Sequence, residues 1–213
     1  MCKGKRMSAQ SVEAIAESGH MDAAPLPDWV FPPPDGFTAD DFLRMRGLPR
    51  HTELIDGSLV FVSPQRMWHS WVLSLLSIEL DDQAPSELRA VREMSVKLAK
   101  RQVPEPDVSV VRAEAVDPLR TCFEAEEVVL AVEAVSPSSE EFDRDTKPRR
   151  YAAAGIKHFW RVELEEERTV VYVYELDRAT RSYLLTGIHH DRLKLTVPFD
   201  IEIDLTAVGK RTR

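Results

Sequence analysis

The stretch VVLAVEAV, residues 128–135, decides the fold, because seven of its eight residues are apolar. Strand side chains alternate between two faces, and here both faces are apolar, so the stretch predicts a strand buried on both sides. A helix is expected over about residues 143–154, ended by Gly155, and a second strand over 157–164. This order predicts a parallel β-α-β crossover, and therefore an α/β or mixed α+β fold.

The flanking sequence adds further strands and two helices. Thr38 is expected to cap a helix that runs to about Arg46, and residues 69–82 repeat apolar side chains at helical spacing. Residues 53–62 predict a hairpin that turns at Asp56-Gly57. Short strands are expected at 88–98 and 107–111, followed by a C-terminal antiparallel meander at 169–174, 181–186 and 192–196.

Composition and length favour one folded domain. The chain has 213 residues, of which 43% are hydrophobic and 30% charged, which excludes wholesale disorder and coiled coil. Residues 1–35 predict a disordered or extended Pro-rich tail, residues 36–208 a single domain, and residues 209–213 a short basic tail. The sequence leaves open whether translation starts at Met1, Met7 or Met21.

Charge and cysteine content limit the partners and the compartment. The net charge of −8 excludes a general coat for nucleic acid, although a local basic patch or metal ions could still bind it. Two cysteines cannot form a disulfide framework, so a reducing cytoplasm fits best. No apolar run approaches the roughly 20 residues that span a bilayer, so no membrane partner is expected.

Glu133 is the unusual residue of the buried strand. An unpaired buried carboxylate is costly, so Glu133 requires a base, a metal or a shared proton, unless it lies at the exposed end of the strand. A second acid, Asp107, opens the short strand at 107–111 directly after Pro106. On its own Asp107 is typical of a turn. Together, two acids near the ends of neighbouring strands could hold one Mg²⁺ ion.

Lys147 lies where the helix after Glu133 is expected to begin. A lysine at this place could direct its ammonium group at a phosphate or at an attacking water. The alternative is a solvated surface lysine.

Several short motifs, in this order and at these spacings, resemble those of the Uma2 (DUF820) family. They cover roughly residues 37–205 and comprise ELIDG at 53–57, PDV at 106–108, VEAVSPS at 132–138, the series Asp143, Lys147 and Tyr151, AG at 154–155 and FW at 159–160. The family is a branch of the PD-(D/E)XK nuclease superfamily, so the resemblance implies a restriction endonuclease-like fold.

The resemblance also implies a set of site residues. Asp107 and Glu133 would be metal ligands, and Ala134 would offer its backbone carbonyl. Glu53 matches an acid that many superfamily members add to the site. The superfamily lysine is missing at Val135, and within Uma2 a lysine on the following helix, here Lys147, takes its role.

Two other groups of residues are candidates for substrate contact. Arg144, Arg149 and Arg150 lie near Lys147, and could hold a phosphate backbone or form a charge-balanced helix surface. His69 opens the expected helix at 69–82, where it could line the cleft or pack at the helix start.

The leading hypothesis is therefore a Mg²⁺- or Mn²⁺-dependent endonuclease that hydrolyses phosphodiester bonds in DNA, in the cytoplasm and with homodimerisation left open. The alternative is a catalytically inactive nuclease fold that serves as a binding or assembly module. The retained Asp107, Glu133 and Lys147 favour the enzyme, whereas the net charge of −8 favours the alternative.

Overall fold

The computed structural model describes residues 28–61, 65–137 and 139–210. The chain divides into two compact units, Met1–Phe31 and Pro32–Arg213. The described part of the first unit contains a short 3-10 helix, η1 (Asp28–Val30). Most of the predicted tail at 1–35, all three candidate start methionines and the last three residues of the predicted C-terminal tail lie outside the described residues.

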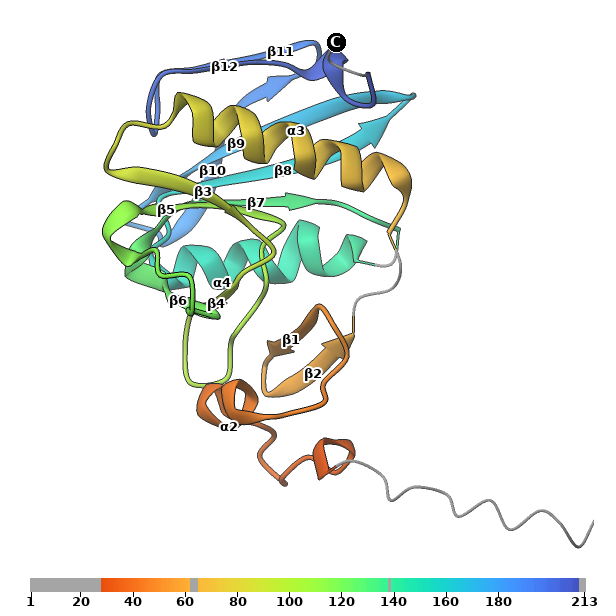
Figure 1. Cartoon of the computed structure of the whole chain (residues 1–213), viewed down its shortest axis with the longest axis vertical. Coiled ribbons are helices and arrows are strands. Elements are labelled where there is room, and N and C mark those ends of the chain that lie inside the picture. Colours follow the sequence, from red (N-terminus) through yellow and green to blue (C-terminus); the bar gives the residue numbers. More distant parts are fainter. Residues whose placement is uncertain (1–27, 62–64, 138, 211–213) are drawn as a thin grey trace, which may run out of the picture. The chain divides into compact units, whose positions relative to one another are not determined.

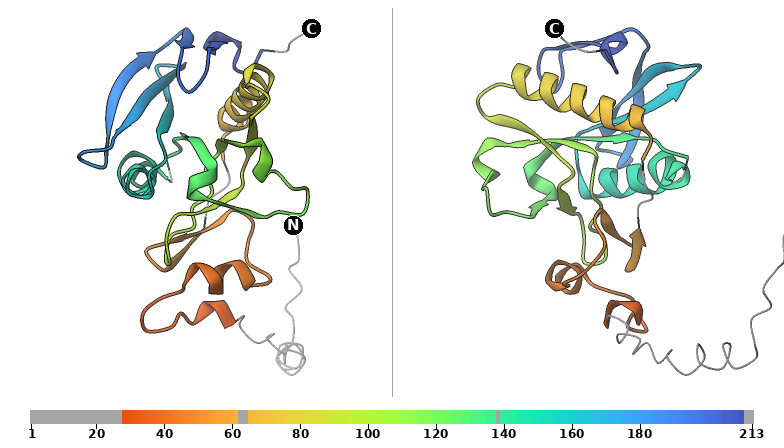
Figure 2. Two further views of the ribbon diagram at one scale, coloured as in Figure 1. Left: turned by 90° about the vertical axis from the view of Figure 1, so that its left-hand side faces the viewer. Right: turned by 45° about the vertical axis from the view of Figure 1, so that its right-hand side comes forward.

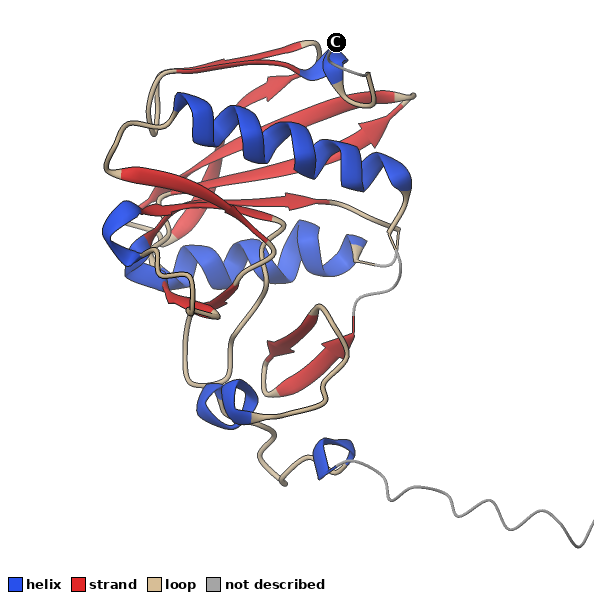
Figure 3. Cartoon of the chain, in the orientation of Figure 1, coloured by secondary structure: helices blue, strands red, loops and turns tan. Residues whose placement is uncertain are grey.

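A six-stranded mixed sheet forms the centre of the second unit (Figures 1 and 3). Its strands, in spatial order, are β10 (Ser182–His189), β9 (Arg168–Asp177), β8 (His158–Glu165), β7 (Val128–Ala134), β5 (Val108–Arg112) and β3 (Leu88–Arg92). Residues 128–134 of the apolar stretch form β7, and six of these seven residues are buried.

The predicted crossover is confirmed. β7 and β8 are parallel, with Ala131 opposite Phe159, and the connection between them contains α4 (Lys147–Ala154). Gly155 ends this helix in the left-handed conformation, with a φ of 87° that residues carrying a Cβ rarely adopt. All other neighbouring strands of the sheet are antiparallel. The fold is therefore a mixed α/β architecture, as expected.

Two helices cover opposite faces of the sheet (Figure 2). On one face α3 (Met67–Gln83) contributes Leu73, Leu76 and Leu80 to a core that includes Leu130 and Trp160 of the sheet. On the other face, Tyr151 of α4 packs with a second cluster that includes Ala131, Phe159 and Val111. Burial on both faces explains why β7 is apolar on both faces.

An N-terminal helix and hairpin precede the sheet. Thr38 caps α2 (Ala39–Arg44) in a reciprocal capping box with Asp41. β1 (Thr52–Ile55) and β2 (Ser58–Phe61) form the predicted hairpin, and both residues of the Asp56-Gly57 turn have positive φ. All four residues of β1 are buried, so this hairpin is fixed to the rest of the unit.

Smaller elements complete the unit. They are the parallel pair β4 (Ser95–Lys97) and β6 (Cys122–Glu124), the hairpin β11 (Arg192–Leu195) and β12 (Ile201–Asp204), the 3-10 helices η2 (Ala113–Ala115), η3 (Ala125–Glu127) and η5 (Leu205–Ala207), and the π-helical segment η4 (Phe142–Thr146).

Two sequence expectations differ from the structure. The single strand expected at 88–98 is broken at Glu93, whose φ of 52° turns the chain between β3 and β4. The third segment of the expected meander, β11, pairs with β12 instead of β10. The physical reason is that Leu193, Ile201 and Ile203 are buried in the core on the α3 side, which draws the hairpin away from the sheet edge.

No helix within the described residues is long and apolar enough to cross a membrane.

Leu130→Ala should destabilise the protein by about 2–5 kcal/mol, because it leaves a cavity in a fully buried strand. Urea unfolding measures this loss. Leu119→Ala is the control, because Leu119 is 91% exposed and its truncation should change the unfolding free energy by less than about 0.5 kcal/mol. Similar losses in both variants would contradict the assignment of β7 to the core.

Candidate active site

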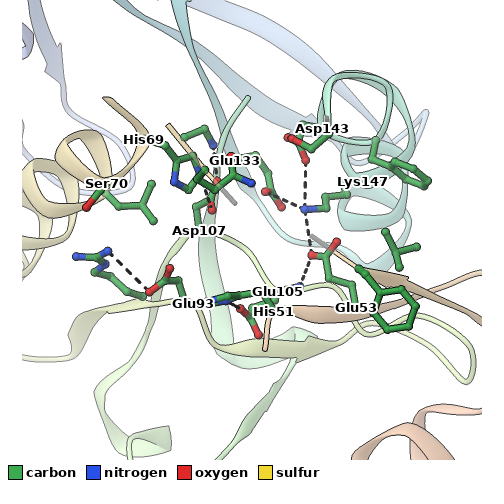
Figure 4. A pocket seen from close by; sticks show the side chains of 18 residues that line it. His51, Glu53, His69, Ser70, Glu93, Glu105, Asp107, Glu133, Asp143 and Lys147 are labelled. Atoms are coloured by element: carbon green, nitrogen blue, oxygen red, sulfur yellow. Dashed lines mark hydrogen bonds and ion pairs between the residues drawn. The ribbon is translucent and has the colours of Figure 1, made fainter. Parts of the chain in front are cut away.

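A cavity of about 590 Å³ contains most of the charged residues that the sequence analysis singled out (Figure 4). Its ionisable lining residues are His51, Glu53, His69, Arg92, Glu93, Glu105, Asp107, Glu133, Asp143 and Lys147. They come from β1 and the residue before it, the start of α3, the end of β3 and the residue after it, the segment that leads into β5, the end of β7, η4 and the start of α4.

Strand register brings the two predicted acids together. β5 and β7 are antiparallel neighbours with Val108 opposite Val132, so the residue before β5, Asp107, comes next to Glu133 near the end of β7. The Ala134 N–H donates to Asp107 Oδ2 at 2.7 Å, and His69 Nε2 lies 3.1 Å from Asp107 Oδ1. Asp107 is thus a fixed carboxylate and not a turn residue in solvent.

Glu133 is buried, with only 1% of its surface exposed. Its Oε2 lies 3.0 Å from the Lys147 Nζ, and its Oε1 accepts a hydrogen bond from the Tyr151 hydroxyl at 2.5 Å. The alternative that Glu133 sits at an exposed strand end is therefore excluded. Each oxygen of the carboxylate has a donor, as burial of a charged group requires.

Lys147 is surrounded by three buried carboxylates (Figure 4). Its Nζ lies 3.0 Å from Glu53 Oε1, 3.0 Å from Glu133 Oε2 and 3.2 Å from Asp143 Oδ1. Only 5% of the residue is exposed, so it is not a solvated surface lysine. Glu53 also accepts the backbone N–H of Glu105 at 2.7 Å, which ties the hairpin to the segment before β5.

The backbone before α4 explains how Lys147 reaches the site. Its N–H bonds to the carbonyl of Phe142, five residues earlier, so residues 142–146 form a π-helical turn. Pro148 lacks an N–H, and in a regular α-helix its ring would clash with the carbonyl of Arg144. A wider turn accommodates the proline, and it places Asp143 and Lys147 on the same side; π turns of this kind are frequent at functional sites.

Three buried carboxylates share a single ammonium group, that of Lys147. Burial raises the pKa of Glu133 well above its usual value; Asp143, Asp107 and Glu53 raise it further, and Lys147 opposes them. Burial also raises the pKa of Asp143. Burial alone would lower the pKa of Lys147, but the charge of Glu133, then of Glu53 and Asp143, holds that pKa well above its usual value.

Two histidines pair with acids at the cavity wall. Burial would lower the pKa of His69, but the hydrogen bond and charge of Asp107 outweigh it, so the pKa is raised. His51 Nδ1 lies 2.6 Å from Glu105 Oε1. Burial raises the pKa of Glu105, although the bond to His51 opposes the shift.

The donor set suits a hard divalent cation. Asp107 and Glu133 offer carboxylate oxygens, and Ala134, the last residue of β7, offers a backbone carbonyl. Mg²⁺ is commonly held by one or two carboxylates, with waters and substrate oxygens completing an octahedron. Within the described residues, no three His, Cys, Asp or Glu side chains form a metal-binding group.

The predicted basic cluster is paired with acids. Arg144 pairs with Glu140 and Glu163, Arg149 with Asp145, and Arg150 with Asp56 at 2.8 Å. None of these three arginines lines the cavity described above.

Several residues of the cavity, and Tyr151 beside it, have no role predicted from the sequence. Asp143 and Tyr151 carried a signal, because they lie four residues before and after Lys147 and so share its helix face. The sequence contains no pattern that points to His51, Glu93 and Glu105, because only the folding of the hairpin and of the β3–β4 turn brings them to this cavity.

Comparisons with known proteins identify the family and support the fold. Residues 39–207 match the model of the Uma2 family, described as a putative restriction endonuclease. A crystal structure of a putative nuclease belonging to DUF820 from Anabaena variabilis has a similar fold, with a TM-score of 0.60 and 17% sequence identity over 76% of this chain and 89% of that chain. No curated protein matches the sequence.

Lys147→Met should cost about 3–5 kcal/mol of unfolding free energy at neutral pH, because it leaves buried carboxylates without their shared cation. Urea unfolding in a chelating buffer measures this loss. Lys157→Met is the control, because Lys157 is exposed and its loss should change stability by less than about 0.5 kcal/mol. If both variants lose equally little unfolding free energy, Lys147 does not hold the cluster of carboxylates together.

Glu133→Gln should change how stability depends on pH in the metal-free protein. A raised pKa means that folded Glu133 keeps its proton when the unfolded chain has lost it. The stability of the wild type should therefore fall as pH rises above the ordinary value of 4.5 and through the folded-state pKa. Unfolding measured from acid to neutral pH should show a shallower fall in Glu133→Gln. If the unfolding free energy depends on pH identically in the wild type and Glu133→Gln, the pKa of Glu133 is not raised.

Proposed function

Because the chain belongs to the Uma2 family of putative restriction endonucleases, we propose that it is a nuclease that hydrolyses phosphodiester bonds in DNA with Mg²⁺ or Mn²⁺. We propose the cytoplasm as its place of action, since its two cysteines suit a reducing compartment. Whether it nicks DNA as a monomer or cleaves both strands as a homodimer depends on its oligomeric state.

One observation carries the proposal. Asp107 and Glu133 come from adjacent antiparallel strands and line one cavity, and four further carboxylates, those of Glu53, Glu93, Glu105 and Asp143, line the same cavity. A fold gains no stability from collecting buried like charges, so their retention favours a site that binds a cation during its work.

In the proposed site Asp107, Glu133 and the Ala134 carbonyl hold the metal. When bound, the ion supplies charge neutralisation at the scissile phosphate and a more acidic water. Lys147 directs its ammonium at the cavity and stabilises negative charge that develops on the phosphate. Glu53 and Asp143 hold Lys147 in place, and His69 holds Asp107.

DNA contact is proposed for Arg144, Arg149 and Arg150. Their side chains are 44%, 75% and 42% exposed, and ion pairs at such exposure contribute about 0–1 kcal/mol. A phosphate can therefore replace the exposed carboxylate partners of Arg149 and Arg150 at little cost, whereas Arg144 also pairs with Glu163, which is only 7% exposed, so a phosphate would have to join that pair.

A binding or assembly module without catalysis is the second candidate. The observation in its favour is the net charge of −8, together with the pairing of all three arginines to acids. Metal-dependent cleavage separates the two candidates.

Asp107→Ala and Lys147→Ala should both impair cleavage, but only Asp107→Ala should abolish Mn²⁺ binding. Loss of Asp107 should abolish both plasmid cleavage and Mn²⁺ binding, because it removes a ligand. Loss of Lys147 should lower the cleavage rate about 10²–10³-fold, the effect of removing one charge-stabilising donor, while Mn²⁺ binding persists. Plasmid cleavage and calorimetric titration with Mn²⁺ measure the two effects.

Asp200→Ala is the control for the aspartate variant, because Asp200 is exposed and distant from the cavity lining. All variants are compared at a temperature at which circular dichroism shows them folded. Wild-type protein that binds Mn²⁺ but does not cleave DNA would support the binding module, and full activity in Lys147→Ala would remove that residue from the mechanism.

A further inference from the structure

One helix holds both oxygens of Glu133. Lys147 and Tyr151 are four residues apart at the start and middle of α4, so their side chains lie on one face of the helix. The Lys147 ammonium donates a hydrogen bond to Glu133 Oε2 at 3.0 Å, and the Tyr151 hydroxyl donates one to Oε1 at 2.5 Å. The two bonds differ, because the ammonium is shared with Glu53 and Asp143, whereas the Tyr151 hydroxyl has no other hydrogen-bond partner among the residues that the structure describes.

Core packing fixes the position of the Tyr151 hydroxyl. The residue is fully buried, and its ring packs against Phe159 of β8 with centroids 5.9 Å apart. Phe159 lies on the strand next to β7, which carries Glu133. The ring is thus held by the same sheet that carries the carboxylate, so the hydroxyl and Oε1 keep a fixed separation.

We propose that Tyr151 is a positioning residue whose hydroxyl holds the Glu133 carboxylate in the orientation that binds a divalent cation. The inference rests on the proposed metal-dependent function and adds a residue to it.

The physical reason lies in the last torsion of the glutamate side chain. The final torsion of Glu is broad, so a carboxylate held at one oxygen can rotate. Lys147 contacts Oε2 alone and shares its ammonium with Glu53 and Asp143, so it does not by itself set the rotation of the Glu133 carboxylate about that contact. Groups that hydrogen-bond a metal ligand from behind commonly contribute 10–100-fold to metal affinity or activity.

Tyr183 provides a matched control within the same aromatic cluster. Its ring stacks on the same Phe159 at 5.4 Å, and its hydroxyl donates to the carbonyl of Ile156 at 2.9 Å. Tyr183→Phe therefore removes a hydroxyl and one hydrogen bond in the same core, without touching Glu133. Both phenylalanine variants keep their ring packing, and thermal unfolding verifies that each is folded.

The experiment titrates Mn²⁺ into wild type, Tyr151→Phe and Tyr183→Phe by calorimetry, and measures plasmid cleavage at several Mn²⁺ concentrations. We expect Tyr151→Phe to bind Mn²⁺ about 10–100-fold more weakly, and Tyr183→Phe to bind as the wild type does. Because Tyr151 acts through the metal, high Mn²⁺ should restore most of the cleavage rate, with the KM for DNA unchanged.

Two results would overturn the inference while leaving the proposed function intact. One is a wild-type Mn²⁺ affinity in Tyr151→Phe, and the other is an equal loss in both tyrosine variants, which would mark a general effect on the core. A wild-type protein that neither binds Mn²⁺ nor cleaves DNA would instead overturn the proposed function, and this inference with it.

Discussion

The Lys147 ammonium is the contact on which the arrangement of the site depends. It joins Glu133 of the central strand and Asp143 of the π-helical turn to Glu53 of the hairpin, which is about 80 residues away in the sequence. At about 3 Å each pair attracts strongly, but four buried charges also lose their hydration. Such a cluster is stable only if all its members stay in place, so one cation fixes how hairpin, sheet and helix meet.

The cluster is not the arrangement that stability alone would select. Replacing buried ion pairs by apolar side chains of similar volume is often neutral or stabilising. Here the apolar alternative is available nearby, since Ala131, Leu130 and Phe159 form tight cores on both faces of the same strands. The charged site interrupts these cores at one end of β5 and β7. Local violations of packing rules of this kind are expected where a protein binds or reacts.

The cavity and its surroundings contain two kinds of cationic side chain. Lys147 is buried and held by three acids, whereas Arg144, Arg149 and Arg150 form exposed pairs on the surface of the same segment. Exposed pairs exchange partners easily because water screens them, and the buried group does not. The segment 142–154 therefore carries one buried cation, Lys147, and three partly exposed ones.

The sequence by itself determined the crossover, because apolar residues on both faces of 128–135 and a helix ended by Gly155 allow few other folds. It also determined which acids are unusual, because a carboxylate in an apolar strand must find a partner. It did not determine the turn at Glu93 or the separate β11–β12 hairpin, since both follow from packing against distant residues. Nor did it decide that Lys147 is buried, that Tyr151 holds Glu133, or that the arginines are paired. Charge interactions depend on distance and on access to water, and only the tertiary structure sets these two quantities.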